Sequence, residues 1–306
     1  MSEKKIVIIG GGQASCQVAT SLRQKKFTGD ISILSSESYL PYQRPPLSKK
    51  YLSGELAAER LYLKPEKFYE EQNINIFLDS YVEEIDRKNS QLVLLKDKNH
   101  ISFDYDNLVI ATGTEPRLMP TDNSDMEGVH YLRSISDVEK IKSSLKDSKN
   151  MVIIGGGYIG LEVAAVSKTL GLNVTVIEMA SRILERVTSP IISSFYNSFH
   201  ESKGVNILTS TSVKGINGDK KVSSVETSLG TIDADIVIGT DPDSDRLGIA
   251  VRNENNELEL LNGNQIMIVL TNFILEKENF KNLNNPFVAT TIVSSPMLKK
   301  IAEYFN

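Results

Sequence analysis

Two glycine-rich segments have the G-x-G-x-x-G spacing that is typical of sites for the pyrophosphate of a dinucleotide. One segment runs Gly155-Gly156-Gly157-Tyr158-Ile159-Gly160, and near the N-terminus Gly10, Gly12 and Ser15 take the same three positions. Glycine allows a tight turn and a close approach of the backbone to the pyrophosphate, which the N-terminus of the following helix attracts. Ser15 departs from the pattern, but it is small enough to keep the helix close to the strand. Both segments are therefore candidate dinucleotide sites.

Each glycine segment stands where a buried strand would pass into a helix. The apolar runs Lys5–Ile9 and Met151–Ile154 are β-branched at most positions, which predicts buried parallel strands. A stretch of helical spacing follows each of them, and then a second predicted strand, Asp30–Leu34 or Asn173–Ile177. This strand–helix–strand order is the context that a dinucleotide motif requires.

A carboxylate follows the second strand of each unit and is the candidate partner of a ribose. Glu178 comes directly after its strand, and Glu37 lies somewhat further from its glycine segment than is usual. A carboxylate at this place accepts hydrogen bonds from a ribose 2′-hydroxyl and repels a 2′-phosphate, so the second site is expected to prefer NADH over NADPH. Arg182 lies near enough in the sequence to weaken that preference slightly.

Three aspartates near the C-terminal third of the chain have the spacing of a metal loop. Asp241, Asp243 and Asp245 alternate along the chain, so that in an extended loop their side chains converge on one side. Three carboxylates offer the hard oxygen ligands that Mg²⁺ prefers. Arg246, the next residue, would then be placed to bind a phosphate beside the metal.

Composition excludes several functional classes. The chain has 306 residues, 40% of them hydrophobic and 24% charged, with a formal net charge of −5 and one cysteine. We expect no nucleic-acid partner and no membrane partner, because nothing in the charge favours either and the apolar runs are far too short to span a bilayer. One cysteine excludes an internal disulfide, so a cytoplasmic location is expected.

Further motifs carry a resemblance to a known family. The segment Pro41-Tyr42-Gln43-Arg44-Pro45-Pro46-Leu47-Ser48-Lys49 stands between the two glycine segments, together with Ala111-Thr112-Gly113-Thr114 and Leu132-Arg133-Ser134. With these motifs, residues from 4 to about 237 closely resemble the FAD-dependent, NADH-utilising ferredoxin and rubredoxin reductases. The resemblance implies FAD at the first site and NADH at the second. Its cofactor-binding residues would include Ala111, Thr112 and Gly113.

The resemblance also implies roles for individual residues and a reaction. Lys49 would lie near the flavin ring and Glu162 near the nicotinamide, as the two catalytic residues. Arg44, Val82 and Arg133 would flank or contact FAD. Hydride would pass from NADH to the flavin, and electrons would leave singly to a small iron–sulfur protein of the ferredoxin or rubredoxin type. After residue 238 the family's return segment to the FAD domain and its C-terminal domain are not recognised, so FAD affinity is expected to be low.

A second resemblance covers the end of the chain. Residues from about 233 to 306 resemble the middle of the α-D-phosphohexomutases, the phosphoglucomutase and phosphomannomutase family, in which the three aspartates would bind magnesium. The phosphoserine stretch of that family is not recognised, so no mutase turnover is expected. The run Asp233–Gly239 suits both families, which leads us to expect a chimera of two incomplete parts. A mutase remnant and a non-catalytic NADH-binding module remain the alternatives to the reductase.

The predicted fold class is α/β. We expect two Rossmann-like dinucleotide-binding domains followed by a partial α/β unit of the phosphohexomutase type. The FAD-binding domain would span residues 1–115 and be incomplete, the NAD-binding domain would span 116–237, and the partial unit would span 238–306.

Overall fold

Short β-branched runs form two parallel sheets in the structure, a computed structural model that describes residues 4–96, 99–240, 249–252 and 258–261 together with Lys300. The chain divides into two compact units, residues 1–242 and 243–306. Both parallel sheets belong to the first unit, and the predicted α/β class is confirmed. Among the described helices, none combines the length and the apolar character needed to cross a membrane.

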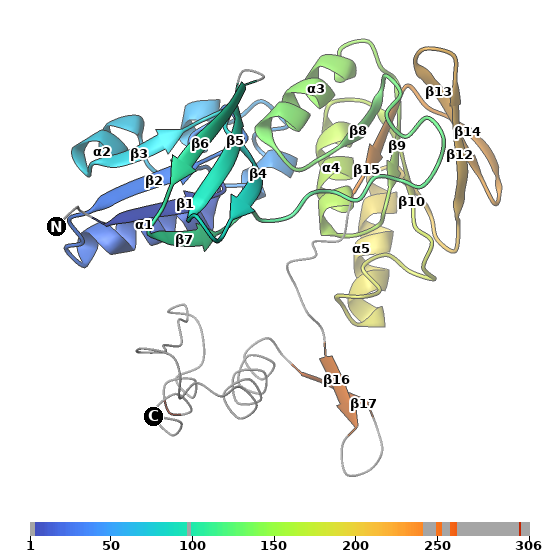
Figure 1. The fold of residues 1–306 in the computed structure, drawn as a ribbon. Coiled ribbons are helices and arrows are strands. Elements are labelled where there is room, and N and C mark those ends of the chain that lie inside the picture. The colour runs from blue at the N-terminus through green and yellow to red at the C-terminus, as the bar shows by residue number, and fades with distance from the viewer. Residues whose placement is uncertain (1–3, 97–98, 241–248, 253–257, 262–299, 301–306) are drawn as a thin grey trace. The chain divides into compact units, whose positions relative to one another are not determined.

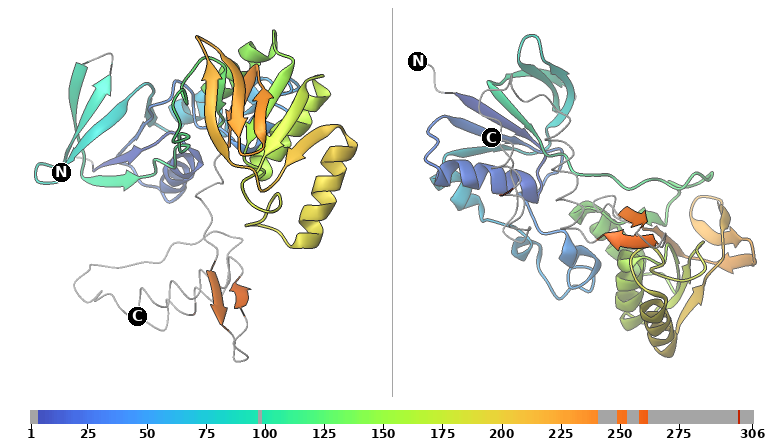
Figure 2. Two further views of the ribbon diagram at one scale, coloured as in Figure 1. Left: turned by 90° about the vertical axis from the view of Figure 1, so that its right-hand side faces the viewer. Right: turned by 90° about the horizontal axis from the view of Figure 1, so that it is seen from below.

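The first parallel sheet has the strand order β3-β2-β1-β7. Its strands are β1 (Lys5–Ile9), β2 (Asp30–Leu34), β3 (Ile74–Phe77) and β7 (Asn107–Ile110). Helices α1 (Gln13–Gln24) and α2 (Glu66–Glu71) cover one face, where Ile8 and Ile31 pack in one core with Ala19 of α1. An antiparallel sheet covers the other face (Figures 1 and 2), and it consists of β4 (Tyr81–Asp86), β5 (Gln91–Lys96) and β6 (Asn99–Asp104).

The second parallel sheet has the order β11-β10-β9-β15-β8 and repeats this layering. Its strands are β8 (Val129–Tyr131), β9 (Asn150–Ile154), β10 (Asn173–Ile177), β11 (Val205–Leu208) and β15 (Ile236–Gly239). The helices of this half are α3 (Ile135–Leu145), α4 (Tyr158–Thr169) and α5 (Pro190–Ser202). An antiparallel sheet packs on one face, with strands β12 (Val213–Gly218), β13 (Val222–Thr227) and β14 (Gly230–Asp233).

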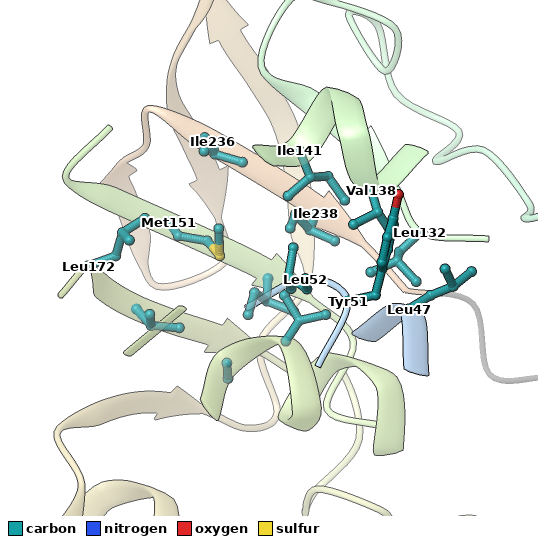
Figure 3. Close-up of a cluster of buried hydrophobic side chains, with 14 of the residues drawn as sticks. Leu47, Tyr51, Leu52, Leu132, Val138, Ile141, Met151, Leu172, Ile236 and Ile238 are labelled. Carbon is teal, nitrogen blue, oxygen red and sulfur yellow. The ribbon is translucent and has the colours of Figure 1, made fainter. Parts of the chain in front are cut away.

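The segment that joins β2 to α2 packs into the core of the second sheet. It contains two short 3-10 helices, η1 (Pro45–Ser48) and η2 (Ala58–Arg60). Leu47, Tyr51 and Leu52 are buried in one cluster with the side chains of α3, β9 and β15 (Figure 3). Burial of three large side chains against the second sheet fixes this segment, and with it Lys49, beside helix α4.

Strand β15 lies in the middle of the second sheet, paired with β9 on one side and β8 on the other. The Asp235 carboxylate accepts hydrogen bonds from the backbone N–H groups of Lys149 and Asn150 at 3.0 and 2.9 Å. At the other end, the Thr240 hydroxyl donates to the carbonyl of Gly155 at 3.2 Å. Residues 235–240 are thus integral to the sheet that carries the second glycine segment.

Of the second unit, the structure describes one hairpin. Strand β16 (Ile249–Arg252) pairs antiparallel with β17 (Leu258–Leu261). The predicted metal ligands Asp241, Asp243 and Asp245 lie outside the described residues, so the magnesium site and the phosphohexomutase-like unit stay predictions.

Candidate functional site

The two glycine segments adopt the same backbone turn. The N–H of Gly10 donates to the carbonyl of Leu34 at 2.8 Å, and that of Gly155 donates to Ile177 at 2.8 Å. Both glycines have positive φ angles, +114° and +112°. A Cβ at Gly10 would lie 2.2 Å from the carbonyl oxygen of Ala111, so only glycine fits this turn. The same approach places the predicted residues Ala111 and Thr112 beside the first loop.

Each loop presents the N-terminus of a helix to open space. Gly12 and Gly157 are the N-caps of α1 and α4, and neither helix start receives a side-chain hydrogen bond. A Cβ at either glycine would meet no atom within 4 Å. The first-turn N–H groups of α4, which begins with Tyr158 and Ile159, are therefore free for an anion. This geometry fits the pyrophosphates of FAD and NADH.

The third position of the motif separates the two loops. A Cβ at Gly160 would lie 2.1 Å from the carbonyl oxygen of Gly155, so α4 packs against its loop as closely as glycine alone allows. The corresponding Ser15 is fully buried, and its hydroxyl has no hydrogen-bond partner in the described protein. Burial of an unpaired hydroxyl is unfavourable, so the departure from the motif makes the first loop less stable.

The residue after the second strand differs between the two sites. Glu178 follows β10 directly, and its carboxylate accepts hydrogen bonds from the N–H groups of Gly156 and Ala180, both at 2.8 Å. Ser35 holds the equivalent place after β2, since the N–H groups of Ser35 and Glu178 donate to Phe77 and Leu208 of the third strands. The Glu178 carboxylate, predicted to bind the ribose, is therefore fixed beside the second glycine loop. At the first glycine loop Ser35 takes this position.

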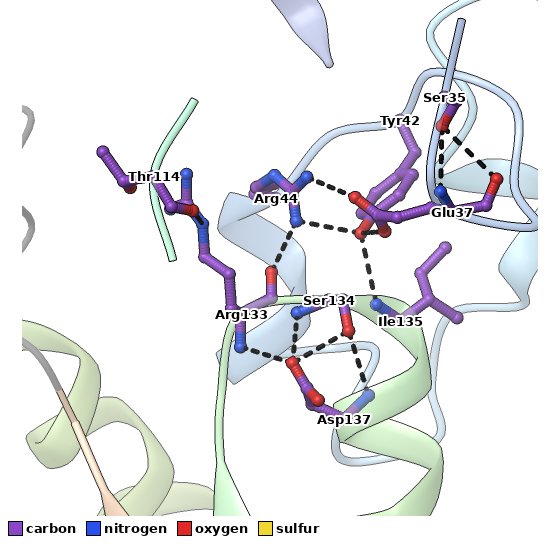
Figure 4. Close-up of polar contacts among 9 residues, drawn as sticks. All are labelled: Ser35, Glu37, Tyr42, Arg44, Thr114, Arg133, Ser134, Ile135 and Asp137. Atoms are coloured by element: carbon purple, nitrogen blue, oxygen red, sulfur yellow. Dashed lines mark hydrogen bonds and ion pairs between the residues drawn. The ribbon is translucent and has the colours of Figure 1, made fainter. Parts of the chain in front are cut away.

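Glu37 lies two residues beyond that place and belongs to a polar network (Figure 4). Its carboxylate accepts a hydrogen bond from the Tyr42 hydroxyl at 2.5 Å and forms an ion pair with the Arg44 guanidinium at 2.6 Å. Arg44 also donates to the carbonyl of Arg133 at 2.7 Å. Three of the predicted FAD residues, Glu37, Arg44 and Arg133, are thus brought together across the two parallel-sheet halves.

The side chain of Arg133 extends from this network to the first loop. Its Nε donates to the carbonyl of Thr114 at 3.1 Å, and a Cβ at Gly113 would lie 3.6 Å from its Nη2. A guanidinium beside the Ala111–Gly113 segment and the Gly10 turn is placed to pair with a pyrophosphate. Val82, in contrast, lies on β4 and packs at the edge of the core between the first parallel sheet and its antiparallel cover.

The two predicted catalytic residues meet. The Lys49 ammonium forms an ion pair with the Glu162 carboxylate on α4 at 2.7 Å. The buried Ser48 hydroxyl donates to the same oxygen of Glu162. The contact links the loop of the first domain to the helix of the second nucleotide site, which is where a nicotinamide and a flavin would have to approach each other.

The guanidinium of Arg182 is engaged in three hydrogen bonds with its own loop and the first turn of α5. Its guanidinium donates to the carbonyls of Thr188 and Glu185 at 3.0 and 2.9 Å and to the Ser193 hydroxyl at 2.5 Å. All of these acceptors belong to the loop before α5 and its first turn. The predicted weakening of the NADH preference by Arg182 therefore has no support in its contacts.

Tyr42, Ser48 and Ser35 take part in the site geometry but were not singled out from the sequence. The first two stand inside the Pro41–Lys49 motif, so the motif itself was the available signal. Ser35 could have been found by counting from the end of the strand, as for Glu178. Within the described parts of the two units, no group of three or more histidine, cysteine, aspartate or glutamate side chains could hold a metal ion.

Comparison with known proteins agrees with this geometry. The sequence model of the pyridine nucleotide-disulphide oxidoreductase family matches residues 4–268 of this chain. Rhodocoxin reductase of Rhodococcus erythropolis is 41% identical over 235 residues, which are 76% of this chain and 54% of that protein. Rubredoxin-NAD(+) reductase of Pseudomonas putida is 40% identical over 236 residues, 76% of this chain and 60% of that protein.

A solved structure of a reductase is also similar to this chain. The crystal structure of a covalent putidaredoxin reductase–putidaredoxin complex superposes with a TM-score of 0.74 and 38% identity, covering 79% of this chain and 59% of that one. The chain spans a little over half the length of the curated relatives it matches.

Proposed function

Since the chain belongs to the pyridine nucleotide-disulphide oxidoreductase family, we propose that it binds FAD and NADH and passes electrons to a small iron–sulfur protein of the ferredoxin or rubredoxin type. FAD would lie at the β1–α1 loop, in a domain of residues 1–115, and NADH at the β9–α4 loop, in a domain of residues 116–237. The Lys49–Glu162 ion pair between the two halves carries this proposal. The similar proteins are reductases of rhodocoxin and rubredoxin by name, which supports the choice of partner.

Bound FAD supplies the chemistry that accepts a hydride and releases electrons one at a time. The protein's own residues bind and orient. Lys49 places a cation at the end of η1, where it would stabilise negative charge that develops on a bound flavin. Glu162 holds that ammonium in place, and the Ser48 hydroxyl donates a hydrogen bond to the same Glu162 oxygen. Loss of any of the three would disturb the approach of the two cofactors.

The proposal is tested by NADH-driven reduction of an added [2Fe–2S] ferredoxin in the presence of FAD. Lys49→Gln removes the ammonium beside Glu162, and Lys50→Gln removes the ammonium of another exposed lysine one residue later. We expect ferredoxin reduction by the wild-type chain and by K50Q, with a rate at least about tenfold lower for K49Q. The same rate in both variants would remove Lys49 from the site.

The phosphohexomutase resemblance of residues 238–306 remains a separate hypothesis about the second unit. The reductase family model extends to residue 268, beyond the predicted junction at about 237, which favours the reductase interpretation up to that point. Mg²⁺-dependent turnover of glucose 1-phosphate or mannose 1-phosphate would support a mutase remnant, and we expect none. NADH binding without any FAD uptake would select a non-catalytic NADH-binding module. The buried, unpaired cysteine agrees with the proposed cytoplasmic location.

A further inference from the structure

The hydroxyl of Tyr42 lies at the centre of the polar network that joins the two halves of the first unit. Its ring is 2% exposed and belongs to the core that contains Leu132, Ile135 and Val138. The hydroxyl donates to Glu37 at 2.5 Å, and it accepts from Arg44 at 3.0 Å and from the backbone N–H of Ile135 at 3.3 Å. A phenol has one donor and two acceptor positions, so all three are used.

Two features make this arrangement rigid. The Ile135 N–H belongs to the first turn of α3, where backbone donors have no partner within the helix, so the Tyr42 hydroxyl satisfies one of them. The ring sits among apolar side chains and cannot rotate without loss of packing. Burial raises the pKa of Tyr42, and the hydrogen bond to Glu37 raises it further, so the hydroxyl keeps its proton throughout the working pH range.

The network has consequences for the first cofactor site. Without the Tyr42 hydroxyl, one oxygen of Glu37 would lose its only hydrogen bond in the described protein. The Glu37 carboxylate would then be held by Arg44 alone and would be free to move together with the Arg44 side chain. Arg44 in turn holds the backbone of Arg133, whose guanidinium lies beside Gly113. A change at one hydroxyl therefore reaches the three side chains that are expected to contact FAD.

We propose that Tyr42 is a positioning residue of the FAD site, which fixes Glu37 and Arg44 and ties both to the start of α3. The inference rests on the proposed function for the identity of the ligand. It predicts an effect on flavin affinity that exceeds any effect on the nicotinamide site. Tyr42→Phe removes the hydroxyl and keeps the buried ring.

The matched control is Tyr62→Phe. Tyr62 faces Tyr42 in an isolated β-bridge and packs against the same core, but its hydroxyl is outside the network. We would titrate the flavin-free full chain with FAD by quenching of flavin fluorescence, and titrate it separately with NADH. For Y42F we expect the FAD Kd to rise about tenfold or more, since hydrogen bonds to charged groups are lost. The NADH Kd, and both constants for Y62F, should stay within about twofold of wild type.

A double-variant cycle with Glu37→Gln tests whether Tyr42 acts through Glu37. The two losses of FAD affinity should be clearly less than additive. An unchanged FAD Kd for Y42F would overturn the inference. So would equal losses of FAD and NADH affinity accompanied by a lower unfolding temperature, because a general structural role would produce them.

A wild-type chain that takes up no FAD would overturn the proposed function instead. The positioning role of Tyr42 is then tested by the rate of hydrogen exchange of the Ile135 amide in the flavin-free protein. Faster exchange in Y42F than in wild type and Y62F would support the positioning role, and equal exchange would overturn it.

Discussion

Glu178 and Ser35 occupy the same place in two sheets of the same design, directly after the second parallel strand. Each side chain faces the middle glycine of its loop: a Cβ at Gly156 would lie 3.2 Å from a Glu178 carboxylate oxygen, and one at Gly11 would lie 2.2 Å from the Ser35 hydroxyl oxygen. At this position the second site thus carries a fixed negative charge and the first site does not. Selection against a 2′-phosphate is therefore expected at the second site alone.

Glu178→Ala is expected to weaken NADH binding without creating an NADPH site. Loss of a charged acceptor should raise the NADH Kd about tenfold. NADPH should gain little, because Arg182 is bound by Thr188, Glu185 and Ser193 and is not free for a phosphate. Fluorescence titration with both nucleotides measures this, with Glu185→Ala as a control carboxylate in the adjoining loop. NADPH binding as tight as wild-type NADH binding would contradict the assignment of Arg182.

Gly157→Glu is expected to abolish NADH binding while the fold survives. The open space above Gly157 accepts a side chain, but the side chain would fill the pyrophosphate position with a negative charge. An NADH titration and a thermal unfolding curve measure the two effects. Asp243→Ala, in the second unit, should leave NADH binding unchanged. Equal losses in both variants would show a coupling of the two units that this account does not contain.

At the level of elements, the contact between each glycine loop and its helix sets the stability of the site. Gly160→Ala places a methyl group 2.1 Å from the Gly155 carbonyl oxygen and should lower the free energy of unfolding by about 2 kcal/mol. Ser15→Ala, at the equivalent position of α1, removes a buried unpaired hydroxyl and should raise it by about 1 kcal/mol. Urea unfolding of both variants measures the two signs. Destabilisation by Ser15→Ala would mean that its hydroxyl has a partner.

The start of β15 depends on a charge and therefore on pH. Hydrogen bonds from the backbone N–H groups of Asn150 and Lys149 hold the pKa of Asp235 below its usual value. A carboxyl whose pKa is lower in the folded state stabilises the fold above its unfolded pKa of about 3.9, and that contribution is lost as the pH falls through the folded pKa.

Asp235→Asn should therefore cost about 1 kcal/mol at pH 7, after allowance for solvent screening at this half-buried site. The difference from wild type should shrink as the pH falls below the unfolded pKa of about 3.9 and disappear below the folded pKa. Denaturant unfolding at a series of pH values measures it. A difference that stays constant down to low pH would assign the effect to packing instead of charge.

At the level of the whole molecule, the sequence predicts those elements that depend on the pattern of neighbouring residues. The strands β1, β2, β9 and β10 follow the apolar runs, and both glycine loops lie where the motif predicts. The family resemblance implies places for Lys49 near the flavin and for Glu162 near the nicotinamide, but it does not predict that the two side chains form an ion pair. The structure adds the physical cause: Leu47, Tyr51 and Leu52 on either side of Lys49 are buried in the second sheet's core.

Other features depend on tertiary contacts that no local pattern contains. Glu37 follows β2 closely, and only its contacts with Tyr42 and Arg44 show that its carboxylate belongs to the polar network. The bonds of Arg182 join positions that become neighbours when the loop before α5 folds back. The sequence shows Tyr42 only as an aromatic residue of a proline-rich segment, and its hydrogen bond to the start of α3 depends on the packing of that helix.

We propose that one folded unit, residues 1–242, brings a flavin site and a nicotinamide site together through Lys49 and Glu162. The most direct test is the visible absorption spectrum of the purified chain loaded with FAD, recorded before and after anaerobic addition of NADH. Flavin bands that are retained by the protein and bleach with NADH are the predicted result. Folded protein without bound flavin, or bound flavin that NADH leaves unchanged, would contradict the account.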